Sequence, residues 1–376
     1  MGGSPRLRVL CAPNAFKGTL TAAAAAAALA AGVRDAGALA RALPMADGGD
    51  GTLDTLLSVS PSARIERHRV CGPLGGRLVA RLGWISTTTA VVELAETSGL
   101  RRLRGHPDAL RATSRGAGEL ISLALDGGAR HILVGIGGSA CTDGGAGLLA
   151  ALGAKLLDGR GRPLGLGGGA LTALESADLR DLDPRLRLCR VEVVSDVDSP
   201  LLGRLGAAHL FGPQKGATDA EVDLLAAGLR RLAEVLERDA HVPAALRDQA
   251  GAGAAGGSGY GLAAAGAALL PGASLVADAI GLDRAISESD LVVTGEGRLD
   301  RQTASGKAPL EVARRSSRLG VPCVVVAGEV SSDPGGFHRT LSLADLAGPG
   351  EDPRGVPRRL LRRAGAQVVR EMAGGG

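Results

Sequence analysis

The feature that most constrains this chain is a recurring pattern of short apolar runs that lead into glycine-rich loops. Five runs are rich in β-branched residues and have the length of a strand: residues 7–12, 131–136, 191–195, 291–294 and 323–327. Helical stretches follow three of them, at residues 19–31, 146–157 and 309–319. Nearly continuous apolar strands that alternate with helices are typical of a parallel sheet buried on both faces. The pattern therefore predicts an α/β fold.

Residues 66–94 break this alternation. Short strand-like segments there are joined by Gly-Pro and Gly-Gly turns, and no helix separates them, which predicts an antiparallel patch. We therefore expect a second domain to be inserted into the first. Residues 1–66 and 284–376 would form one discontinuous domain, and residues 67–283 would form the inserted domain. A length of 376 residues suits two domains.

Composition excludes several functions. Phe, Trp and Tyr make up 1% of the chain, so it lacks the rings on which single-strand and RNA-binding modules stack bases. The formal net charge is +4, and arginines cluster at residues 101–104, 314–318 and 358–363. Solvated helix faces explain such clusters better than a nucleic-acid patch does. We expect no nucleic-acid partner.

Neither secretion nor membrane anchoring is expected from this sequence. The apolar run at residues 22–31 is too short to cross a bilayer, and the first ten residues carry no hydrophobic signal core. The five cysteines are an odd number, lie far apart and form no C-x-x-C pair. Reduced thiols in a cytosolic protein fit this pattern better than disulfides or a zinc site. The predicted location is the cytoplasm.

Six polar loops carry Asp, Glu, Lys or Thr, five of them together with glycine, and most of them follow predicted strands. They are residues 13–19 (PNAFKGT), 45–52 (MADGGDGT), 137–145 (GGSACTDGG), 196–200 (DVDSP), 211–218 (FGPQKGAT) and 295–300 (GEGRLD). Open α/β sheets bind ligands beyond the carboxyl ends of their strands, so these loops are expected to hold a ligand. Glycine lets backbone N–H groups approach an anion, lysine adds charge for phosphate, and grouped carboxylates suit Mg²⁺. The loops therefore predict phosphoryl transfer.

Lysine is rare in this chain and is found mostly in the loops. Only four of the 43 basic residues are lysines. Lys17, Lys215 and Lys307 are flanked by glycines, whereas Lys155 lies in a predicted helix and is expected on the surface. Because arginine replaces lysine almost everywhere else, the three loop lysines are expected to bind phosphate. Chance survival is the alternative.

Known nucleotide-binding motifs are missing. The chain has neither a G-x-x-x-x-G-K-[ST] P-loop nor the protein-kinase signatures. Gly251, Gly253 and Gly256 match G-x-G-x-x-G, but a long charged helix is expected before them at residues 219–240, so a packing loop explains them better than a dinucleotide site. The six histidines lie outside the polar loops, which disfavours a Ser-His-Asp hydrolase. A dinucleotide oxidoreductase and a non-catalytic metabolite-binding protein remain open alternatives.

Seven segments, in their order along the chain, resemble those of the type I glycerate kinase family: PNAFKGTLTA, PMADGGDGT, GIGGSACTDGGAG, SDVDSPL, FGPQKGAT, GAGAAGGSGYGL and VVTGEGRLDRQT. The resemblance implies a kinase that transfers the γ-phosphoryl group of ATP, with Mg²⁺, to a hydroxyl of D-glycerate. The product would be 2-phosphoglycerate or 3-phosphoglycerate, and a related small hydroxy acid is the alternative substrate. It also implies two α/β domains, one a flavodoxin-like doubly wound parallel sheet and the other a mixed sheet inserted into it.

The sequence departs from the family pattern at three places. Asn14 and Ala15 stand where the family more often has Asp-Ser, and Cys141 and Thr142 stand where it often has Thr-Asn. Arg115 lies where an aromatic residue is common. The loop lysine and the paired acids are retained.

Roles for the charged residues follow from their positions. Lys17 is expected between a strand and a helix N-terminus, where it would bind phosphate or carboxylate and act in catalysis. Asp47 and Asp50 flank two glycines and can converge on a metal or on the substrate hydroxyl, with an Asx turn as the alternative. Asp196 and Asp198 occupy alternate positions after a strand and can share a metal ion. For direct in-line transfer, Asp196 or Asp47 would accept the hydroxyl proton.

Arg298 can bind the carboxylate of glycerate with its planar fork, unless it forms a local salt bridge with Glu296 and Asp300. Asp143 is expected either to cap a helix or to bind substrate. The predicted residues are, for substrate binding, Asp50, Ser139, Asp143 and Arg298; for nucleotide phosphates, Gly137, Gly138, Lys215, Gly295 and Lys307; and for the metal, Asp196, Asp198, Glu296 and Asp300. Glycerate and ATP are the expected partners, and a homodimer is left open.

Overall fold

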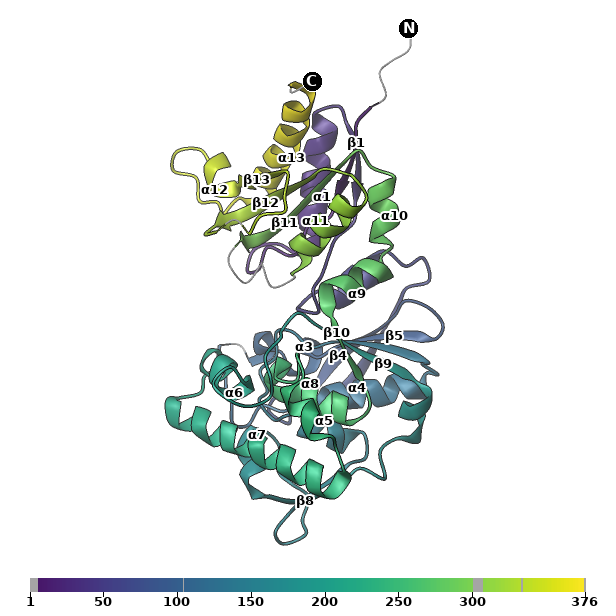
Figure 1. Cartoon of the computed structure of the whole chain (residues 1–376), viewed down its shortest axis with the longest axis vertical. Coiled ribbons are helices and arrows are strands. Elements are labelled where there is room, and N and C mark those ends of the chain that lie inside the picture. Colours follow the sequence, from purple (N-terminus) through teal and green to yellow (C-terminus); the bar gives the residue numbers. More distant parts are fainter. Residues whose placement is uncertain (1–5, 104, 300–306, 333, 375–376) are drawn as a thin grey trace. The chain divides into compact units, whose positions relative to one another are not determined.

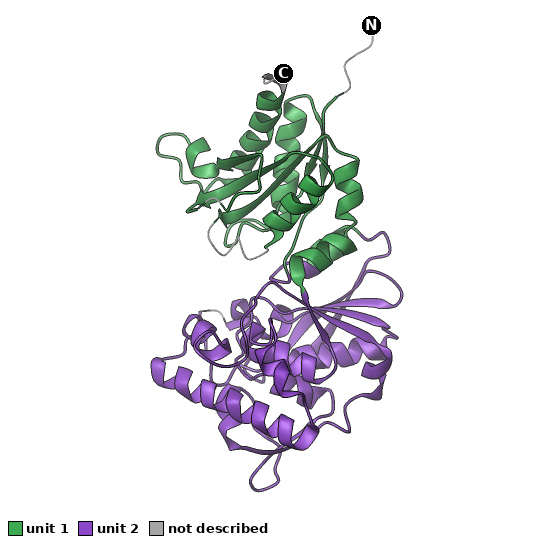
Figure 2. Ribbon diagram, in the orientation of Figure 1, with its two compact units in different colours: residues 1–47, 54–59, 271–376 green, residues 48–53, 60–270 purple. Residues whose placement is uncertain are grey.

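The computed structural model describes residues 6–103, 105–299, 307–332 and 334–374 (Figure 1). The chain divides into two compact units (Figure 2). Unit 1 comprises Met1–Asp47, Asp54–Val59 and Pro271–Gly376, and unit 2 comprises Gly48–Leu53 and Ser60–Leu270. One unit is therefore inserted into the other in sequence. The predicted domain boundaries after residues 66 and 283 stay a prediction.

Unit 1 contains a five-stranded parallel sheet in the order β13-β12-β11-β1-β2. Its strands are β1 (Arg8–Cys11), β2 (Leu39–Ala42), β11 (Leu291–Leu299), β12 (Cys323–Val330) and β13 (Arg339–Ser342). Counted along this unit alone, the spatial order is 2-1-3-4-5, which is that of flavodoxin-like sheets. The apolar runs predicted as buried strands form β1, β11 and β12, and the predicted fold of this part is confirmed.

Several helices accompany this sheet in unit 1. They are α1 (Ala22–Asp35), α9 (Gly272–Ala279), α10 (Leu282–Ser287), α11 (Ala308–Arg318), α12 (Leu343–Leu346) and α13 (Pro357–Gly374), and α2 (Thr52–Ser58) begins at the end of the short unit 2 segment. The alanine-rich α1 packs against α13 at close range, because a Cβ at Gly32 or Gly365 would overlap backbone of the other helix. Leu29 and Val33 of α1 join Leu360 and Leu361 of α13 in the core of the unit.

Unit 2 contains a six-stranded mixed sheet in the order β10-β9-β6-β5-β4-β3. Its strands are β3 (Arg64–Cys71), β4 (Arg77–Trp84), β5 (Thr89–Glu93), β6 (His131–Gly135), β9 (Arg190–Ser195) and β10 (Ala268–Pro271). The pairs β3/β4 and β4/β5 are antiparallel, and β5/β6 and β6/β9 are parallel. The antiparallel patch and the mixed sheet predicted from the sequence are therefore confirmed.

The helices of unit 2 are α3 (Ala95–Ser98), α4 (Arg115–Asp126), α5 (Ala146–Ala151), α6 (Ala207–Phe211), α7 (Asp219–Ala240) and α8 (Ala254–Ala264), and β7 (Lys155–Asp158) pairs with β8 (Leu174–Asp178). A capping box of Thr218 and Glu221 begins α7, the expected long charged helix. Leu225, Leu229 and Leu232 of α7 are buried in one hydrophobic core of this unit. Another core of the unit includes Trp84.

Two predicted helices are wrong in part. The helix expected at residues 146–157 ends at Ala151, because Gly153 turns the chain at a φ of 109° and the residues after it pair as β7. The small residues at 262–270 also predict a helix, but the helix there ends at Ala264, and β10 follows. Across the part of the chain that the structure describes, no helix combines the length and apolarity needed to cross a membrane. All five cysteines are buried and none forms a disulfide.

Candidate active site

The strand order of unit 1 places its topological switch point between β1 and β11. The loop after β1 is tied to the end of β11 by backbone: Asn14 N–H donates to Gly295 O at 2.8 Å, and the Thr294 hydroxyl donates to Ala12 O at 2.8 Å. Flavodoxin-like sheets bind their ligands beyond the carboxyl ends of the strands at this point. The first and last of the predicted loops therefore meet where a ligand is expected.

Asn14 orients Asp47 at this switch point. The Asn14 side chain is buried, and its Oδ1 accepts from Ala15 N–H at 2.7 Å. Its Nδ2 donates to Asp47 Oδ2 at 3.0 Å, and the two loops also join through Met45 N–H and Pro13 O at 2.9 Å. Because the backbone fixes the flip of the Asn14 amide, the half-buried Asp47 carboxylate is held in one orientation.

Lys17 is exposed in the turn that precedes α1. The ring of Phe16 is buried in the core, and the Thr19 hydroxyl donates to Phe16 O at 2.9 Å, so the turn is anchored on both sides of Lys17. A Cβ at Gly297 would lie 3.2 Å from Lys17 N, which places the backbone of the turn against the extended end of β11. The structure thus brings Lys17, Asp47 and Gly295 to one edge of the unit 1 sheet.

The segment after residue 294 was predicted as a loop, and this is wrong. β11 continues through Leu299, because β12 is long enough to pair with it from Cys323 to Val330. Glu296 is buried, whereas Arg298 is exposed, donates to Ser331 Oγ at 3.0 Å and lies 3.9 Å from Glu329.

Arg298 thus pairs with Glu329, a residue of β12, and the salt bridge considered with Glu296 and Asp300 stays a prediction. Asp300 lies outside the described residues. Lys307 is half-buried at the N-cap of α11.

In unit 2, the Gly48–Leu53 turn lies across the carboxyl ends of β6 and β9. Gly137 N–H donates to Gly48 O at 2.9 Å, and a Cβ at Gly48, whose φ is 89°, would overlap the carbonyl of Val194. A Cβ at Gly138 would lie 2.7 Å from Asp50 Oδ1. Glycine is therefore required at positions 48 and 138 for the turn to pack this closely, and the packing brings Asp50 against the loop after β6. The predicted residues Asp50, Gly137 and Gly138 lie together.

Glu93 is a residue of this site that the sequence analysis missed. It ends β5, its side chain is fully buried, and it accepts from Gly51 N–H at 3.2 Å and from Leu53 N–H at 3.0 Å. Burial raises its pKa to about 7, although these N–H donors and the charge of Arg101 favour the ionised form. A single acid at the end of an otherwise apolar strand is the sequence signal that could have identified it.

Three arginines surround a second buried acid, Glu96. Its oxygens accept from Arg81 at 3.1 Å, Arg101 at 2.6 Å and Arg102 at 3.0 Å. Burial opposes ionisation of Glu96, but the hydrogen bonds and charges of Arg81 and Arg101 bring its pKa below the usual value. Arg101 also donates to Glu93 at 3.3 Å. The cluster at residues 101–104, interpreted from the sequence as a solvated helix face, thus contributes two partly exposed arginines that pair with buried acids.

Lys215 and Ser139 contact each other inside unit 2. Lys215 ends the short helix η4 (Pro213–Lys215) and is 2% exposed. Its Nζ donates to Ser139 Oγ at 3.1 Å and to Cys141 O at 2.6 Å, and burial lowers its pKa. Because the Ser139 hydroxyl accepts from an ammonium group, its own proton can only be donated elsewhere. The contact links the loop after β6 to the FGPQKGAT segment.

The contacts of Asp143 support the helix-capping alternative. The carboxylate is buried and accepts from Ser114 N–H at 2.8 Å, Ser114 Oγ at 3.0 Å and Thr113 Oγ1 at 3.1 Å. It also accepts from Gly145 N–H at 3.2 Å and Gly147 N–H at 3.3 Å. These donors lie at the starts of α4 and α5, so Asp143 joins the two helix N-termini.

Asp196 and Asp198 follow β9 as expected; Asp196 is half-buried and Asp198 is exposed. Within the described ranges, no three His, Cys, Asp or Glu side chains gather as a preformed cation site. The carboxylate oxygens at this strand end are nevertheless of the type that Mg²⁺ prefers.

The glycine-rich segment at residues 251–261 is a packing element. Ala255, Gly256 and Gly257 have left-handed backbone inside α8, and Gly144 N–H donates to Gly256 O at 3.0 Å. A Cβ at Gly256 would overlap the carbonyl of Cys141. The segment therefore supports the back of the loop after β6, as the packing alternative predicts.

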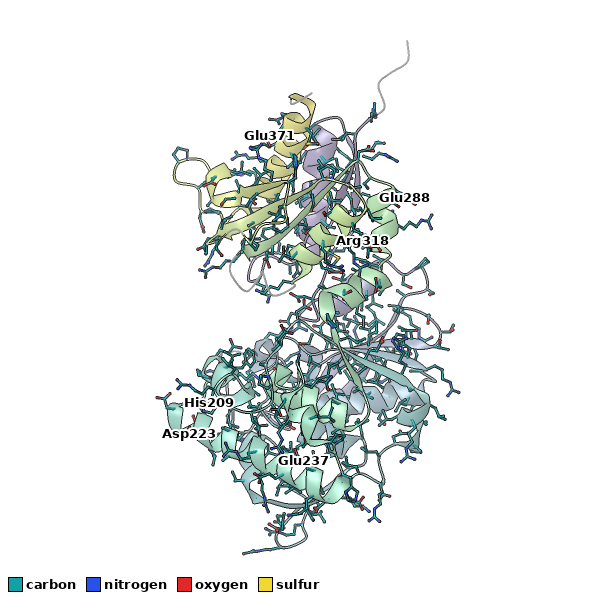
Figure 3. All side chains as sticks on the ribbon, viewed as in Figure 1. His209, Asp223, Glu237, Glu288, Arg318 and Glu371 are labelled. Carbon is teal, nitrogen blue, oxygen red and sulfur yellow. The ribbon has the colours of Figure 1, made fainter. Side chains whose placement is uncertain are left out.

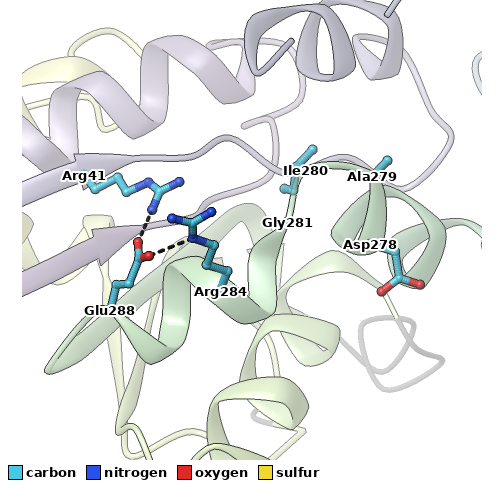
Figure 4. A pocket seen from close by; sticks show the side chains of 7 residues that line it. All are labelled: Arg41, Asp278, Ala279, Ile280, Gly281, Arg284 and Glu288. Atoms are coloured by element: carbon cyan, nitrogen blue, oxygen red, sulfur yellow. Dashed lines mark hydrogen bonds and ion pairs between the residues drawn. The ribbon is translucent and has the colours of Figure 1, made fainter. Parts of the chain in front are cut away.

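A pocket of about 520 Å³ on unit 1 lies apart from these loops (Figure 4). Arg41 and Arg284 line it and both donate to Glu288, at 2.9 and 2.8 Å, so one carboxylate offsets part of their charge. It contains none of the predicted site residues. Among the histidines, His209 of α6 lies 4.0 Å from Asp223 of α7, outside the polar loops (Figure 3).

Comparison with known proteins gives one consistent result. The family model for the glycerate kinase family matches residues 9–373. A glycerate kinase of Bacillus subtilis is 42% identical over 358 residues, with 92% of each chain covered. A glycerate 2-kinase of Escherichia coli is 42% identical over 339 residues, 89% of this chain and 88% of that protein. A crystal structure from Salmonella typhimurium, described as that of a glycerate kinase 2, matches 99% of both chains with a TM-score of 0.85 and 39% identity.

Proposed function

The chain belongs to the glycerate kinase family, and from this premise we propose that it transfers the γ-phosphoryl group of ATP to a hydroxyl group of D-glycerate. The Escherichia coli relative named as a glycerate 2-kinase supports 2-phosphoglycerate as the product. 3-Phosphoglycerate is the alternative product, and a related hydroxy acid is the alternative substrate.

The observation that carries the proposal is the group of residues at the switch point of unit 1. Lys17 is exposed there, Asp47 is held by Asn14, and the absence of a side chain at Gly297 lets the turn that carries Lys17 pack against the end of β11. A lysine and glycine-rich backbone beyond the carboxyl ends of parallel strands suit a phosphate group. Lys307 at the N-terminus of α11 is a further phosphate ligand in this proposal.

The proposed chemistry is direct in-line transfer. The glycerate hydroxyl oxygen forms a bond to the γ-phosphorus, the bond from that phosphorus to the β,γ-bridging oxygen breaks, and ADP leaves. Asp196 or Asp47 accepts the hydroxyl proton, and Lys17 stabilises the charge on the transferring group. Asp47 suits the role of base because Asn14 already fixes its orientation.

We assign the remaining residues to ligand binding. In unit 2, Asp50 and Ser139 would bind the substrate, and the backbone of Gly137 and Gly138 would approach the phosphates. Mg²⁺ would enter with ATP, neutralising phosphate charge, and Asp196, Asp198 and Glu296 are its candidate carboxylate ligands, since Mg²⁺ in kinases takes one or two carboxylates besides phosphate oxygens. Arg298 stays a candidate for the glycerate carboxylate, and Asp143 is assigned to helix capping.

The test is an assay of the purified protein with MgATP and D-glycerate, with ³¹P NMR to identify the phosphorylated carbon. We expect ADP and 2-phosphoglycerate to form together. A protein that forms no phosphoglycerate would overturn the proposal, and formation of 3-phosphoglycerate alone would overturn the regiochemistry.

Two lysine variants test the proposed site. Lys17→Ala should lower kcat/KM at least about a hundredfold, because the variant lacks the ammonium group that stabilises the negative charge on the transferring phosphoryl group. Lys155→Ala is the matched control: Lys155 is exposed on β7 and pairs with Asp181 at 2.6 Å, so its loss should leave the kinetics unchanged. Equal activity of the two variants would remove Lys17 from the mechanism.

A further inference from the structure

Glu93 has an unusual set of partners for a buried acid. Its carboxylate is 0% exposed, and burying a charge is costly unless the charge is paired. The backbone donors that reach it are Gly51 N–H and Leu53 N–H, about forty residues earlier in the chain, and Arg101 supplies the third contact. The Glu93 carboxylate therefore holds the Gly48–Leu53 turn through these backbone hydrogen bonds.

Two connections lead from Glu93 to Asp50. The first is covalent: Gly51 directly follows Asp50, so fixing the Gly51 N–H fixes the peptide plane next to the Asp50 Cα. The second is Arg101, whose Nη2 lies 3.3 Å from Glu93 Oε1 and whose Nη1 lies 4.0 Å from Asp50 Oδ1. Glu96 holds the same Nη2 at 2.6 Å, so the guanidinium is itself fixed. Asp50, nearly half exposed, lies against Gly138.

A second buried glutamate in the same sheet shows that burial alone does not produce this arrangement. Glu192 of β9 is 3% exposed and pairs with His131 at 2.6 Å and with Arg190. These partners lie on strands β6 and β9 themselves. Glu192 therefore joins neighbouring strands, whereas Glu93 joins a strand to a turn that carries a substrate-binding candidate.

We propose that Glu93 is a positioning residue of the phosphoryl transfer, which holds the carboxylate of Asp50 over Gly138 by fixing the Gly48–Leu53 turn. The inference rests on the proposed function and extends it by a residue that does not itself contact substrate. If Glu93 acts through Asp50, its loss should alter glycerate binding and turnover while leaving ATP binding nearly unchanged.

The experiment compares Glu93→Gln with Glu192→Gln as a matched control of equal size and burial. We expect Glu93→Gln to raise the KM for D-glycerate at least about tenfold and to change the KM for MgATP less than about twofold. Glu192→Gln should leave both within about twofold. Hydrogen exchange should speed up at the Gly51 and Leu53 amides in Glu93→Gln only. Normal glycerate kinetics in Glu93→Gln, or equal effects of the two variants, would overturn the inference.

A double-mutant cycle tests the route through Asp50. If Glu93 acts only by positioning Asp50, Glu93→Gln should cost nothing further in an Asp50→Asn background, and multiplicative losses would overturn the inference. The wild-type assay separates the two claims. A wild type that forms no phosphoglycerate overturns the proposed function and this inference with it, whereas an active wild type with a normal Glu93→Gln variant overturns the inference alone.

Discussion

Glu93 should make unit 2 less stable as the pH rises, and Glu93→Gln should remove that dependence. Burial raises the pKa of Glu93 from 4.5 to about 7, so the unfolded chain releases this proton at a lower pH than the folded protein. Between these values the folded state binds more protons, and its stability falls with rising pH. The contribution is fully present below about pH 4.5 and lost as the pH passes about 7. At about 1.4 kcal/mol per pKa unit, the loss is about 3 kcal/mol.

The single tryptophan gives a direct assay of unit 2. Trp84 is the only Trp in the sequence, and it is fully buried in the core of that unit. Denaturant unfolding followed by its fluorescence should be measured from pH 4.5 to 8.5 for the wild type and Glu93→Gln. Other titrating groups are common to both proteins, so the difference between the two curves isolates Glu93. We expect the free energy of unfolding of the wild type to fall by about 3 kcal/mol more than that of the variant across this pH range.

Glu96→Gln supplies a control of opposite sign. The pKa of Glu96 is lowered, so its contribution is present above its ordinary pKa and lost as the pH falls. The penalty for Glu96→Gln should therefore shrink as the pH falls below about 4.5 and stay level above it, whereas the relative advantage of Glu93→Gln grows between about pH 4.5 and 7. If the free energy of unfolding changes with pH in the same way for the wild type and Glu93→Gln, the argument that folding raises the pKa of Glu93 is refuted.

Three further substitutions test the packing. Asp143→Ala should lower the stability of unit 2 by about 3–5 kcal/mol, since it strands buried donors at two helix starts; a loss below 1 kcal/mol in the Trp84 assay would contradict this. Arg315→Met should destabilise unit 1 by about 3 kcal/mol, because Arg315 is buried and bonds to Glu311 at 2.6 Å. Hydrogen exchange in peptides of unit 1 should be faster in this variant than in the control Arg284→Met, which replaces an exposed arginine. Ala255→Gly should stabilise unit 2 by about 0.5–1 kcal/mol by relieving a φ of 53°, and an unchanged Trp84 midpoint would argue against strain.

The parts of the fold that were predictable depend on local pattern. β1, β11 and β12 each contain a short apolar run, and the antiparallel β3–β5 region is marked by turns without helices. The extension of β11 through Leu299 was not predictable in this way, because it depends on the length of β12 beside it. A glycine-rich sequence that looks like a loop becomes a strand when a neighbouring strand supplies its hydrogen bonds.

The site was predictable only where adjacent residues define it. Asp50, Gly137 and Gly138 were expected from their loops, and the structure brings them together. Glu93 was missed because its partners lie in a turn about forty residues away. Asp143 could not be assigned from the sequence for the same reason: Ser114, which decides between capping and substrate binding, lies 29 residues before it.

The contacts of the guanidinium and ammonium groups in the structure suggest why a few lysines are retained in this arginine-rich chain. Arg101 contacts Glu93 and Glu96 through Nη2 while Nη1 lies 4.0 Å from Asp50 Oδ1, so it uses two nitrogens of its planar fork to face three carboxylates. Lys215 instead reaches Ser139 Oγ and Cys141 O from a position that is 2% exposed, where a compact ammonium is the smaller group to enclose. A loop lysine retained in an arginine-rich chain therefore indicates a position that needs a compact positive charge, and binding of phosphate is only one use of such a charge. By this reasoning we expect the exposed Lys17 to be the loop lysine that meets a phosphate, whereas the buried Lys215 is bonded to the loop after β6 through Ser139 and Cys141.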